Sequence, residues 1–581
     1  MQRNMRLAAL LACCVFPAGQ AAAQSSPDPG QSVPGRDQVD PRTEELDRDI
    51  PRVDSDGALD RLPCALDGST VPVTLTEVRF EGSSAGAPLA PEIAEVLAPL
   101  TIPPAGERPI SVVCDVRDAV NARLEQAGYV ALAQIPAQQI DNGVLTLRVI
   151  SARFVEMRVV GDIGGFEDAV TDSATAISEL EPLNRRDIER LLLDAGDIPG
   201  VDITMSITPA RNGIPGDVIG VLNVETRRFQ ALANIQNYGS PQLGREVASL
   251  RVEAYGLTGM SDRTVLTYSN SIDFDEIRVF QASHDFAIND NGLRGEVRGS
   301  IAWTEPDIEN LVLNSRTIIV GAEAQQKLIR NVTTDVTVAA GFEFLQQRTE
   351  IISGSISVPF SKDDLRVAYV RADGDYVRPL ANGRNHWLSG YVQLRKGFGF
   401  LGASQRGQPN DGFSPSRFDG DPEAIVAQAE VRGDLSLAGP LGFEFGGFVQ
   451  WSDNPLLNLE EWTLGNFTYG RGYDPGANSG DRVVAFRAQP TIEVPISRDV
   501  RLEFLGFYDW VRIDNIDAGS VETGRELTSY GAGVRVLLPG RLSLEAYYAS
   551  PQDPALSTDD FPPGDRFLLT LSTRFYPWGG N

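Results

Sequence analysis

Long apolar runs are missing from this sequence of 581 residues once its first residues are passed. No later stretch offers the roughly eighteen uninterrupted apolar residues that a membrane-spanning helix needs. The one early run, Leu7–Phe16, is shorter, follows two arginines and precedes three alanines. That order is typical of a secretory signal peptide, here residues 1–23. The alternative, lipid attachment at Cys13, would divide the apolar run. We therefore expect an exported chain without helical spans.

Cysteine is scarce as well. The chain has 4 cysteines, and two of them fall inside the predicted signal peptide. Cys64 and Cys114 remain. In an exported protein, an isolated pair of cysteines more often forms a disulfide than a metal site. We therefore expect a disulfide between Cys64 and Cys114.

Basic residues and histidines are few. The 51 Lys and Arg residues stand against 79 Asp and Glu residues, a net charge of −28. This balance argues against nucleic acid as a partner, because such binding needs a basic face. Gly82–Gly86 fits the GxSxG pattern of hydrolases, but His284 and His386 both lie in distant predicted strands. We predict no catalytic, cofactor-binding or metal-binding residues, and therefore no enzyme.

The N-terminal region after the signal peptide has the composition of a linker. Residues 24–60 are rich in Pro, Ser, Asp and Arg, and residues 39–49 (VDPRTEELDRD) are the one helix-like stretch. Such a segment has too few apolar residues to form a core. We predict a mobile leader over residues 24–70.

Two α+β units of similar length follow. Residues 71–154 begin with the alternating strand VTLTEVRFEG and continue with two helices and two strands. In the second helix Val116, Val120 and Leu124 recur at helical spacing. Residues 155–226 repeat the order strand, helix, helix, strand, strand. The sequence thus predicts two tandem βααββ domains.

The remainder, residues 227–581, alternates between apolar and polar positions in segments of about ten residues. Residues 248–255, for example, place apolar side chains on one face and charged or polar ones on the other. The last such segment, RFLLTLSTRFY, ends in aromatic residues. The region has 581 − 226 = 355 residues, enough for about 16 membrane-crossing strands. We predict a transmembrane β-barrel of about 16 antiparallel strands; a soluble propeller or adhesin is the alternative.

Several segments resemble a known family. They are LPCALDG, TLTEVRFEG, AGYVALAQIPAQQIDNGVLTLRVISARF, LNRRDIERLLLDAGDIPGVDITMSITPA and the start of the barrel region, ALANIQNYGSPQLGREVASLRVEAYGLTGMSDRTVLTYSN. They resemble the polypeptide-transport-associated (POTRA) domains and the barrel of the FhaC/ShlB transporters of two-partner secretion. The resemblance implies two periplasmic POTRA domains, a sixteen-stranded barrel in outer-membrane lipid, and export of a large, mostly β-helical secreted partner. It also implies insertion by the barrel-assembly machinery. The chain departs from the family at the N-terminal plug helix, which in the family is longer and richer in Gln and Arg than residues 40–49 of this chain.

A late segment, LEEWTLGNFTYGRGYDPGANSGDR, resembles the long loop of this family that folds back into the barrel. Its tip motif corresponds to Arg471, Gly472 and Tyr473, although Gly470 stands where the family has Val or Ile. GFYDWVRI resembles the partner motif on the barrel wall, with Phe507 and Asp509. Strand alternation turns Asp509 toward the lumen. We predict that Arg471 pairs with Asp509 and holds the loop in a transport-competent position.

The leading hypothesis is a translocator whose POTRA strands bind an extended segment of the partner by edge pairing and pass it to the barrel. A passive porin and a barrel-insertion factor of the same superfamily are the alternatives. Two POTRA units disfavour a simple porin. A neighbouring gene for a very large β-helical exoprotein would favour translocation over insertion.

Overall fold

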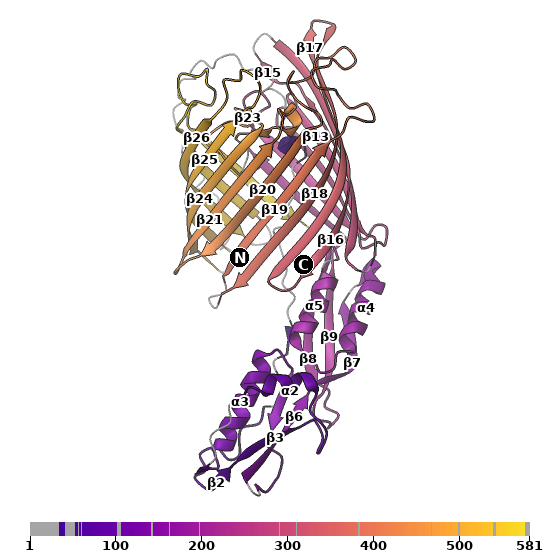
Figure 1. Ribbon diagram of the computed structural model, residues 1–581, viewed down its shortest axis with the longest axis vertical. Helices are drawn as coiled ribbons and strands as arrows, with labels where there is room; N and C mark the ends of the chain where they lie inside the picture. Colours follow the sequence, from indigo (N-terminus) through magenta and orange to yellow (C-terminus); the bar gives the residue numbers. More distant parts are fainter. Residues whose placement is uncertain are drawn as a thin grey trace, which may run out of the picture.

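The computed structural model describes residues 34–575, apart from 41–52, 56, 60, 101–105, 141–142, 162, 197, 290, 309–310, 381–383, 466–467, 498–499 and 539–541. The predicted signal peptide and most of the helix-like stretch 39–49 lie outside the described residues. Two α+β units extend from one end of a barrel, and the second unit lies between the first unit and the barrel (Figure 1). In the described part of the chain, no helix combines the length and the apolar content that crossing a membrane requires.

The first α+β unit is built on a three-stranded sheet of order β3-β6-β5, with β3 and β6 parallel. Its longest helix, α3, buries Val116, Val120 and Leu124 against this sheet, as their helical spacing predicts. A short pair, β2 with β4, lies outside the predicted βααββ order. The elements are β2 (Pro72–Leu75), β3 (Glu77–Glu81), α2 (Pro91–Leu97), β4 (Gly106–Pro109), α3 (Val112–Gln126), β5 (Ala131–Gln134) and β6 (Val144–Ser151).

The second unit has a sheet of order β1-β8-β9-β7. Three of these strands follow the predicted βααββ order, and the fourth, β1 (Val53–Asp54), comes from the leader. The helices cover one face and share a core with the sheet, in which Ile188, Leu192 and Leu222 are fully buried. The remaining elements are β7 (Arg153–Gly161), α4 (Glu167–Ser178), α5 (Arg185–Gly196), β8 (Val201–Pro209) and β9 (Asp217–Thr226).

Sixteen long antiparallel strands form a closed barrel, which β28 completes by pairing with β10. The last strand therefore closes the barrel, and no barrel edge is left for pairing between molecules. The strands are β10 (Phe229–Gln236), β11 (Val247–Tyr255), β12 (Arg263–Ser271), β13 (Ile277–Ala287), β14 (Leu293–Thr304), β16 (Leu311–Arg330), β17 (Thr334–Ser353), β18 (Ile356–Pro379), β19 (Asn385–Gly397), β20 (Ile425–Ser436), β21 (Leu441–Ser452), β24 (Arg482–Pro495), β25 (Arg501–Asp514), β26 (Arg525–Leu538), β27 (Leu542–Pro551) and β28 (Arg566–Phe575), with a two-residue strand β15 (Asp307–Ile308) beside β16.

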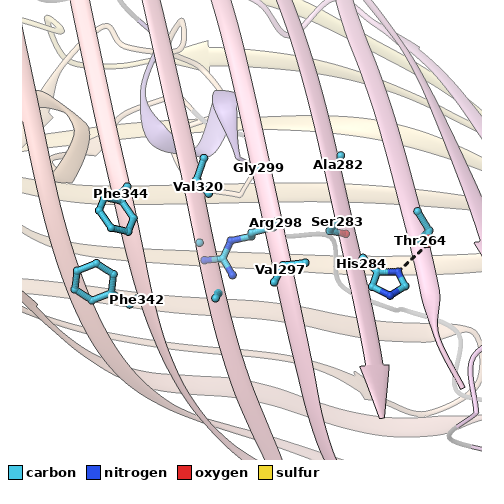
Figure 2. A pocket seen from close by; sticks show the side chains of 12 residues that line it. Thr264, Ala282, Ser283, His284, Val297, Arg298, Gly299, Val320, Phe342 and Phe344 are labelled. Atoms are coloured by element: carbon cyan, nitrogen blue, oxygen red, sulfur yellow. Dashed lines mark hydrogen bonds between the residues drawn. The ribbon is translucent and has the colours of Figure 1, made fainter. Parts of the chain in front are cut away.

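Side chains alternate between the two faces of the barrel wall. On β25 Phe504 and Tyr508 are 49% and 44% exposed on the outside, whereas Asp509 is completely buried toward the lumen. The outside is apolar over much of its height, and Val297, Val320 and Phe344 line a shallow hollow of about 510 Å³ there (Figure 2). This is the pattern of a barrel that meets lipid on the outside.

Three strands are about twice as long as the predicted ten-residue segments. Strands β16, β17 and β18 have 20, 20 and 24 residues, and β17 rises beyond the rest of the barrel (Figure 1). They stay paired with one another almost to their ends, because backbone pairing can continue after the apolar band ends. The alternation of apolar and polar residues predicts only the part of each strand that lies in the apolar band, so it did not predict this extra length.

A short piece of the leader lies inside the barrel. Helix α1 (Arg36–Val39) is seen in indigo within it (Figure 1). Val39 is fully buried and packs against apolar side chains of the inner wall, including Ile277 and Leu345. The Gln281 side-chain amide donates a hydrogen bond of 2.9 Å to the carbonyl oxygen of Val39. We call residues 34–40 the lumen segment; the mobile leader predicted from composition does not anticipate its position.

Candidate functional site in the barrel lumen

The loop between β21 and β24, residues 453–481, turns back into the lumen; we call it the inner loop. It contains a 3-10 turn, η4 (Asn458–Glu460), and the paired strands β22 (Trp462–Thr463) and β23 (Ser479–Gly480). Its side chains Leu464 and Tyr473 are fully buried and join a cluster with inward-facing residues of the wall such as Val511. The loop is therefore packed like a core element, although it connects two strands.

Arg471, at the tip of the inner loop, is bound to Asp509 on β25. Its Nε donates to Oδ2 at 3.0 Å and its Nη2 donates to Oδ1 at 2.8 Å, and its backbone N–H also donates to Oδ2 at 3.0 Å. The side chains of Arg471 and Asp509 are only 3% and 0% exposed. This two-pronged geometry is specific to arginine, since a lysine could not occupy both oxygens in this way.

Further contacts surround the Arg471 guanidinium. Nη1 donates to the side-chain oxygen of Gln489 at 2.7 Å, and Cζ lies 3.8 Å from the ring centroid of Phe507. Burial by itself would lower the pKa of Arg471, but the carboxylate of Asp509 outweighs it and raises that pKa above its ordinary value. Arg471 therefore stays charged, and its charge is compensated in a site that excludes water.

The glycines beside Arg471 allow the close approach. Gly470 has φ +73°, a left-handed conformation that favours glycine. A Cβ atom on Gly472 would lie 2.6 Å from Cβ of Ser529 on β26, and the Gly472 N–H donates to the Ser529 hydroxyl at 3.2 Å. The glycine after the arginine is thus required by contact with the wall. At position 470, where the family resemblance has Val or Ile, the backbone conformation is one that only glycine adopts readily.

Tyr473 anchors the other side of the tip. Its hydroxyl donates to backbone carbonyl oxygens of Thr528 at 2.9 Å and Asp553 at 3.1 Å, and accepts from the Asp553 N–H at 3.2 Å. Asp474 follows and pairs with Arg566 at 3.2 Å. The tip is therefore fixed to three successive strands or their connections, β25, β26 and β27–β28.

A second buried charge cluster joins the lumen segment to the inner loop. Glu343 on β17 is completely buried and receives Arg36 at 2.7 Å, Arg395 at 2.9 Å and also Arg298. Glu460 of the inner loop pairs with Arg36 at 3.2 Å and Arg395 at 2.7 Å. The lumen segment and the inner loop therefore share the same ionic network, and moving either one breaks ion pairs of the other.

A third cluster of charged side chains joins three connections between barrel strands. Arg417, between β19 and β20, pairs with Glu461 and Asp481 of the inner loop at 2.6 Å each, and with Asp517 after β25. Burial raises the pKa of Glu461 to about 8, although the charge of Arg417 opposes the shift. One arginine facing three carboxylates leaves an excess of negative charge, which favours a proton on one of them.

The structure also joins Cys64 to Cys114 as a disulfide, with Cα atoms 5.9 Å apart. It attaches the end of the leader to the first turn of α3 in the first unit. The described residues contain no group of three His, Cys, Asp or Glu side chains placed to hold a metal ion.

Sequence reasoning singled out the tip and its wall partner but missed the other two clusters. Alternation could have marked Glu343, Arg395 and Arg298 as inward-facing charges. No local signal says that side chains from three separate strands meet one another and Arg36. The site is thus larger than the motif that pointed to it.

Comparisons with known proteins agree with this architecture. Residues 216–536 match the model of the family described as haemolysin secretion/activation protein ShlB/FhaC/HecB. The structure is similar to CdiB from Escherichia coli (TM-score 0.62, 15% identity, 90% of this chain and 94% of that chain covered). It is also similar to CdiB from Acinetobacter baumannii (TM-score 0.56, 12% identity, 95% of each chain covered). No curated protein sequence matches the chain.

The family match spans more than half of the sequence, from the end of the second α+β unit through most of the barrel. The structural similarities extend the fold to the N-terminal units, which resemble POTRA domains. The chain therefore belongs to the haemolysin secretion/activation protein ShlB/FhaC/HecB family, non-enzymatic outer-membrane transporters of two-partner secretion that keep their POTRA domains in the periplasm and export a partner protein.

Proposed function

We propose that the exported partner is a large, mostly β-helical exoprotein, which the POTRA domains bind in an extended form and the barrel passes outward. The sheets of both units end in edge strands, whose backbone N–H and C=O groups can pair with an extended segment of many sequences. Outer-membrane lipid surrounds the apolar outer face of the barrel, and the barrel-assembly machinery inserts it during biogenesis.

The contact between Arg471 and Asp509 is the observation that carries the second part of the proposal. Two charges with 3% and 0% exposure are joined by both prongs of the guanidinium. Removing one partner of such a pair costs much free energy, because the charge of the other partner stays buried without compensation. We propose that it keeps the inner loop docked on the wall in a transport-competent position, with Tyr473 and Phe507 packed beside it.

The lumen segment has a different role in this proposal. It occupies the lumen beside the inner loop and is held there through Arg36. An extended polypeptide needs that space, so the lumen segment would leave while the inner loop stays docked. Its departure would break the ion pairs that join Arg36 to the two carboxylates, Glu343 and Glu460.

The test is deletion of the gene followed by measurement of the large exoprotein encoded beside it in the culture medium. We expect secretion to fall to background, to return with the wild-type gene, and the amounts of unrelated outer-membrane proteins to stay unchanged. A general loss of outer-membrane proteins would indicate a barrel-insertion factor instead. Undiminished secretion of the exoprotein would contradict the proposed pairing of transporter and cargo.

A further inference from the structure

The sheet of the second POTRA unit contains one strand more than the unit itself supplies. Strand β1 of the leader runs parallel to the edge strand β8, with Val53 opposite Met205 and Asp54 opposite Ser206. The sheet order β1-β8-β9-β7 therefore has a piece of the leader at one edge. This is β-strand addition within a single chain.

The leader is packed against this edge and does not merely pass it. Ala58 is 3% exposed within the core of the second unit, and Val53 and Leu59 pack against the same core. The Ala58 N–H donates to the carbonyl oxygen of Ser55 at 3.1 Å, which closes a turn directly after β1. We call residues 53–55 and 57–59 the edge strip.

The two edges of the sheet differ in their capacity to accept a strand. Edge strand β7 has a register irregularity between Phe154 and Glu156, and Gly161 at its end has φ +122°. Glu156 and Arg158 form an exposed ion pair of 2.7 Å along it. Bulges and charged side chains of this kind discourage further strand pairing.

Edge strand β8 has no register irregularity and no residue with a positive φ within the described residues, and its ion pair, between Asp202 and Arg227, lies at its start. It pairs with β9 in unbroken register from Val201 to Pro209, and its residues alternate between buried and accessible positions. Strand β1 pairs with just two of its nine residues, Met205 and Ser206. A longer extended segment could form more backbone hydrogen bonds with β8 than the edge strip does.

We infer that β8 is the docking strand for an extended segment of the exported partner, and that the edge strip is the intramolecular occupant this segment must displace. The inference rests on the proposed function, in which POTRA strands bind cargo by edge pairing. The edge strip protects β8 from pairing with unrelated chains. Cargo can bind only while the edge strip is away from β8, so the apparent affinity for cargo is the intrinsic affinity multiplied by the fraction of time that β8 is free. Short segments therefore compete poorly, and long extended ones are selected.

The experiment uses full-length transporter in detergent micelles and, as probe, a fluorescent N-terminal fragment of the exoprotein whose secretion depends on it. Asp54→Pro introduces at an exposed position of β1 a residue that has a fixed φ and fits poorly in a paired strand, so β1 is weakened without disturbing a core. Asp54→Ser is the matched control that keeps the N–H. In the double variant Asp54→Cys with Ser206→Cys, a disulfide can lock the edge strip, because paired strands lie about 4.8 Å apart.

We expect the fragment to bind Asp54→Pro about tenfold more tightly than wild type. This factor corresponds to a wild-type β8 that the edge strip covers about nine-tenths of the time and that the variant leaves free. Asp54→Ser should bind like wild type. The oxidised lock should bind at least about tenfold more weakly, and reductant should restore its affinity without changing that of wild type treated in parallel.

Equal affinities of wild type, Asp54→Pro and the lock would overturn this inference while leaving the proposed function intact, since the fragment would then bind elsewhere on the transporter. Absence of binding to wild type and to every variant would overturn the proposed recognition by POTRA domains and this inference with it. Unchanged heat-dependent migration of the variants in electrophoresis verifies that their barrels are folded.

Discussion

Replacing Arg471 with alanine should release the inner loop from the wall while the barrel still reaches the membrane. Asp509 is completely buried, and in the variant its carboxylate would lose both prongs of the guanidinium. Leaving one partner of such a pair unpaired costs about 3–5 kcal/mol. Since about 1.4 kcal/mol is a factor of ten in an equilibrium constant, the ratio of docked to undocked inner loop should fall at least about a hundredfold. An exposed pair would give only about 0–1 kcal/mol.

Secretion of the exoprotein is the first assay, and protease accessibility of the inner loop in whole cells is the second. Arg471→Ala and Asp509→Ala should each reduce secretion strongly and expose the loop. The double variant should be little worse than either single variant, because the second substitution removes the charge that the first one left unpaired.

Arg294→Ala provides a matched control. Arg294 on β14 pairs with Asp285 on β13 at 2.8 Å, with side chains 14% and 10% exposed, and this pair lies between neighbouring wall strands away from the loop tip. We expect near-normal secretion from this variant. Independent, additive losses in the Arg471 and Asp509 cycle, or normal secretion by both single variants, would refute the reasoning.

Three further predictions concern the disulfide, a tip glycine and the outer charge cluster. Thiol labelling of the unreduced, unfolded mature protein should find neither Cys64 nor Cys114, and Cys64→Ala should lower the free energy of unfolding of the first POTRA unit by about 2–4 kcal/mol; labelling of both cysteines in the wild type would rule the bond out. Gly472→Ala should lose secretion because its Cβ would lie 2.6 Å from Cβ of Ser529, whereas Gly374→Ala, with nothing within 4 Å, should secrete normally; equal secretion by the two variants would contradict the contact. The pKa of Glu461 is raised to about 8 from an ordinary value of 4.5, so the folded loops hold this proton more tightly than the unfolded chain does, and their stability should fall as the pH rises from about 4.5 to 8. Glu461→Gln should flatten this dependence in limited proteolysis at pH 5 and 8, and an unaltered pH dependence would show that Glu461 is not its source.

Alternation predicted the orientation of the side chains in the barrel wall, and the barrel itself followed from alternation together with the length of the region and its export signal. Phe504 and Tyr508 face outward on β25, while Phe507 and Asp509 face inward, as a period of two requires. Helical and strand spacing also predicted the βααββ order in both POTRA units, but not the added pair β2–β4 or the leader strand β1. These features depend on local sequence, which is why a single sequence suffices to predict them.

Contacts between distant segments could not be predicted in this way. The lumen segment is held by Glu343, which lies 307 positions away from Arg36 in the chain, and β1 pairs with a strand about 150 residues later. Alternation reports which face a side chain occupies but not which strand lies opposite. For Arg471 and Asp509, the family resemblance supplied the pairing that local physics leaves open.

The central claim is that the exported polypeptide passes through the barrel lumen. Adjacent residues on β14 provide a direct test, because the side chain of Val297 is 49% exposed on the lipid side and that of Glu296, its neighbour, faces the lumen near Asp285 and Glu323. A photo-crosslinking amino acid would be placed at one position or the other, in cells secreting an exoprotein stalled by a folded C-terminal fusion. We predict crosslinks to the exoprotein from position 296 and none from position 297. Equal crosslinking from both positions, or none from 296 while secretion continues, would contradict transport through the lumen.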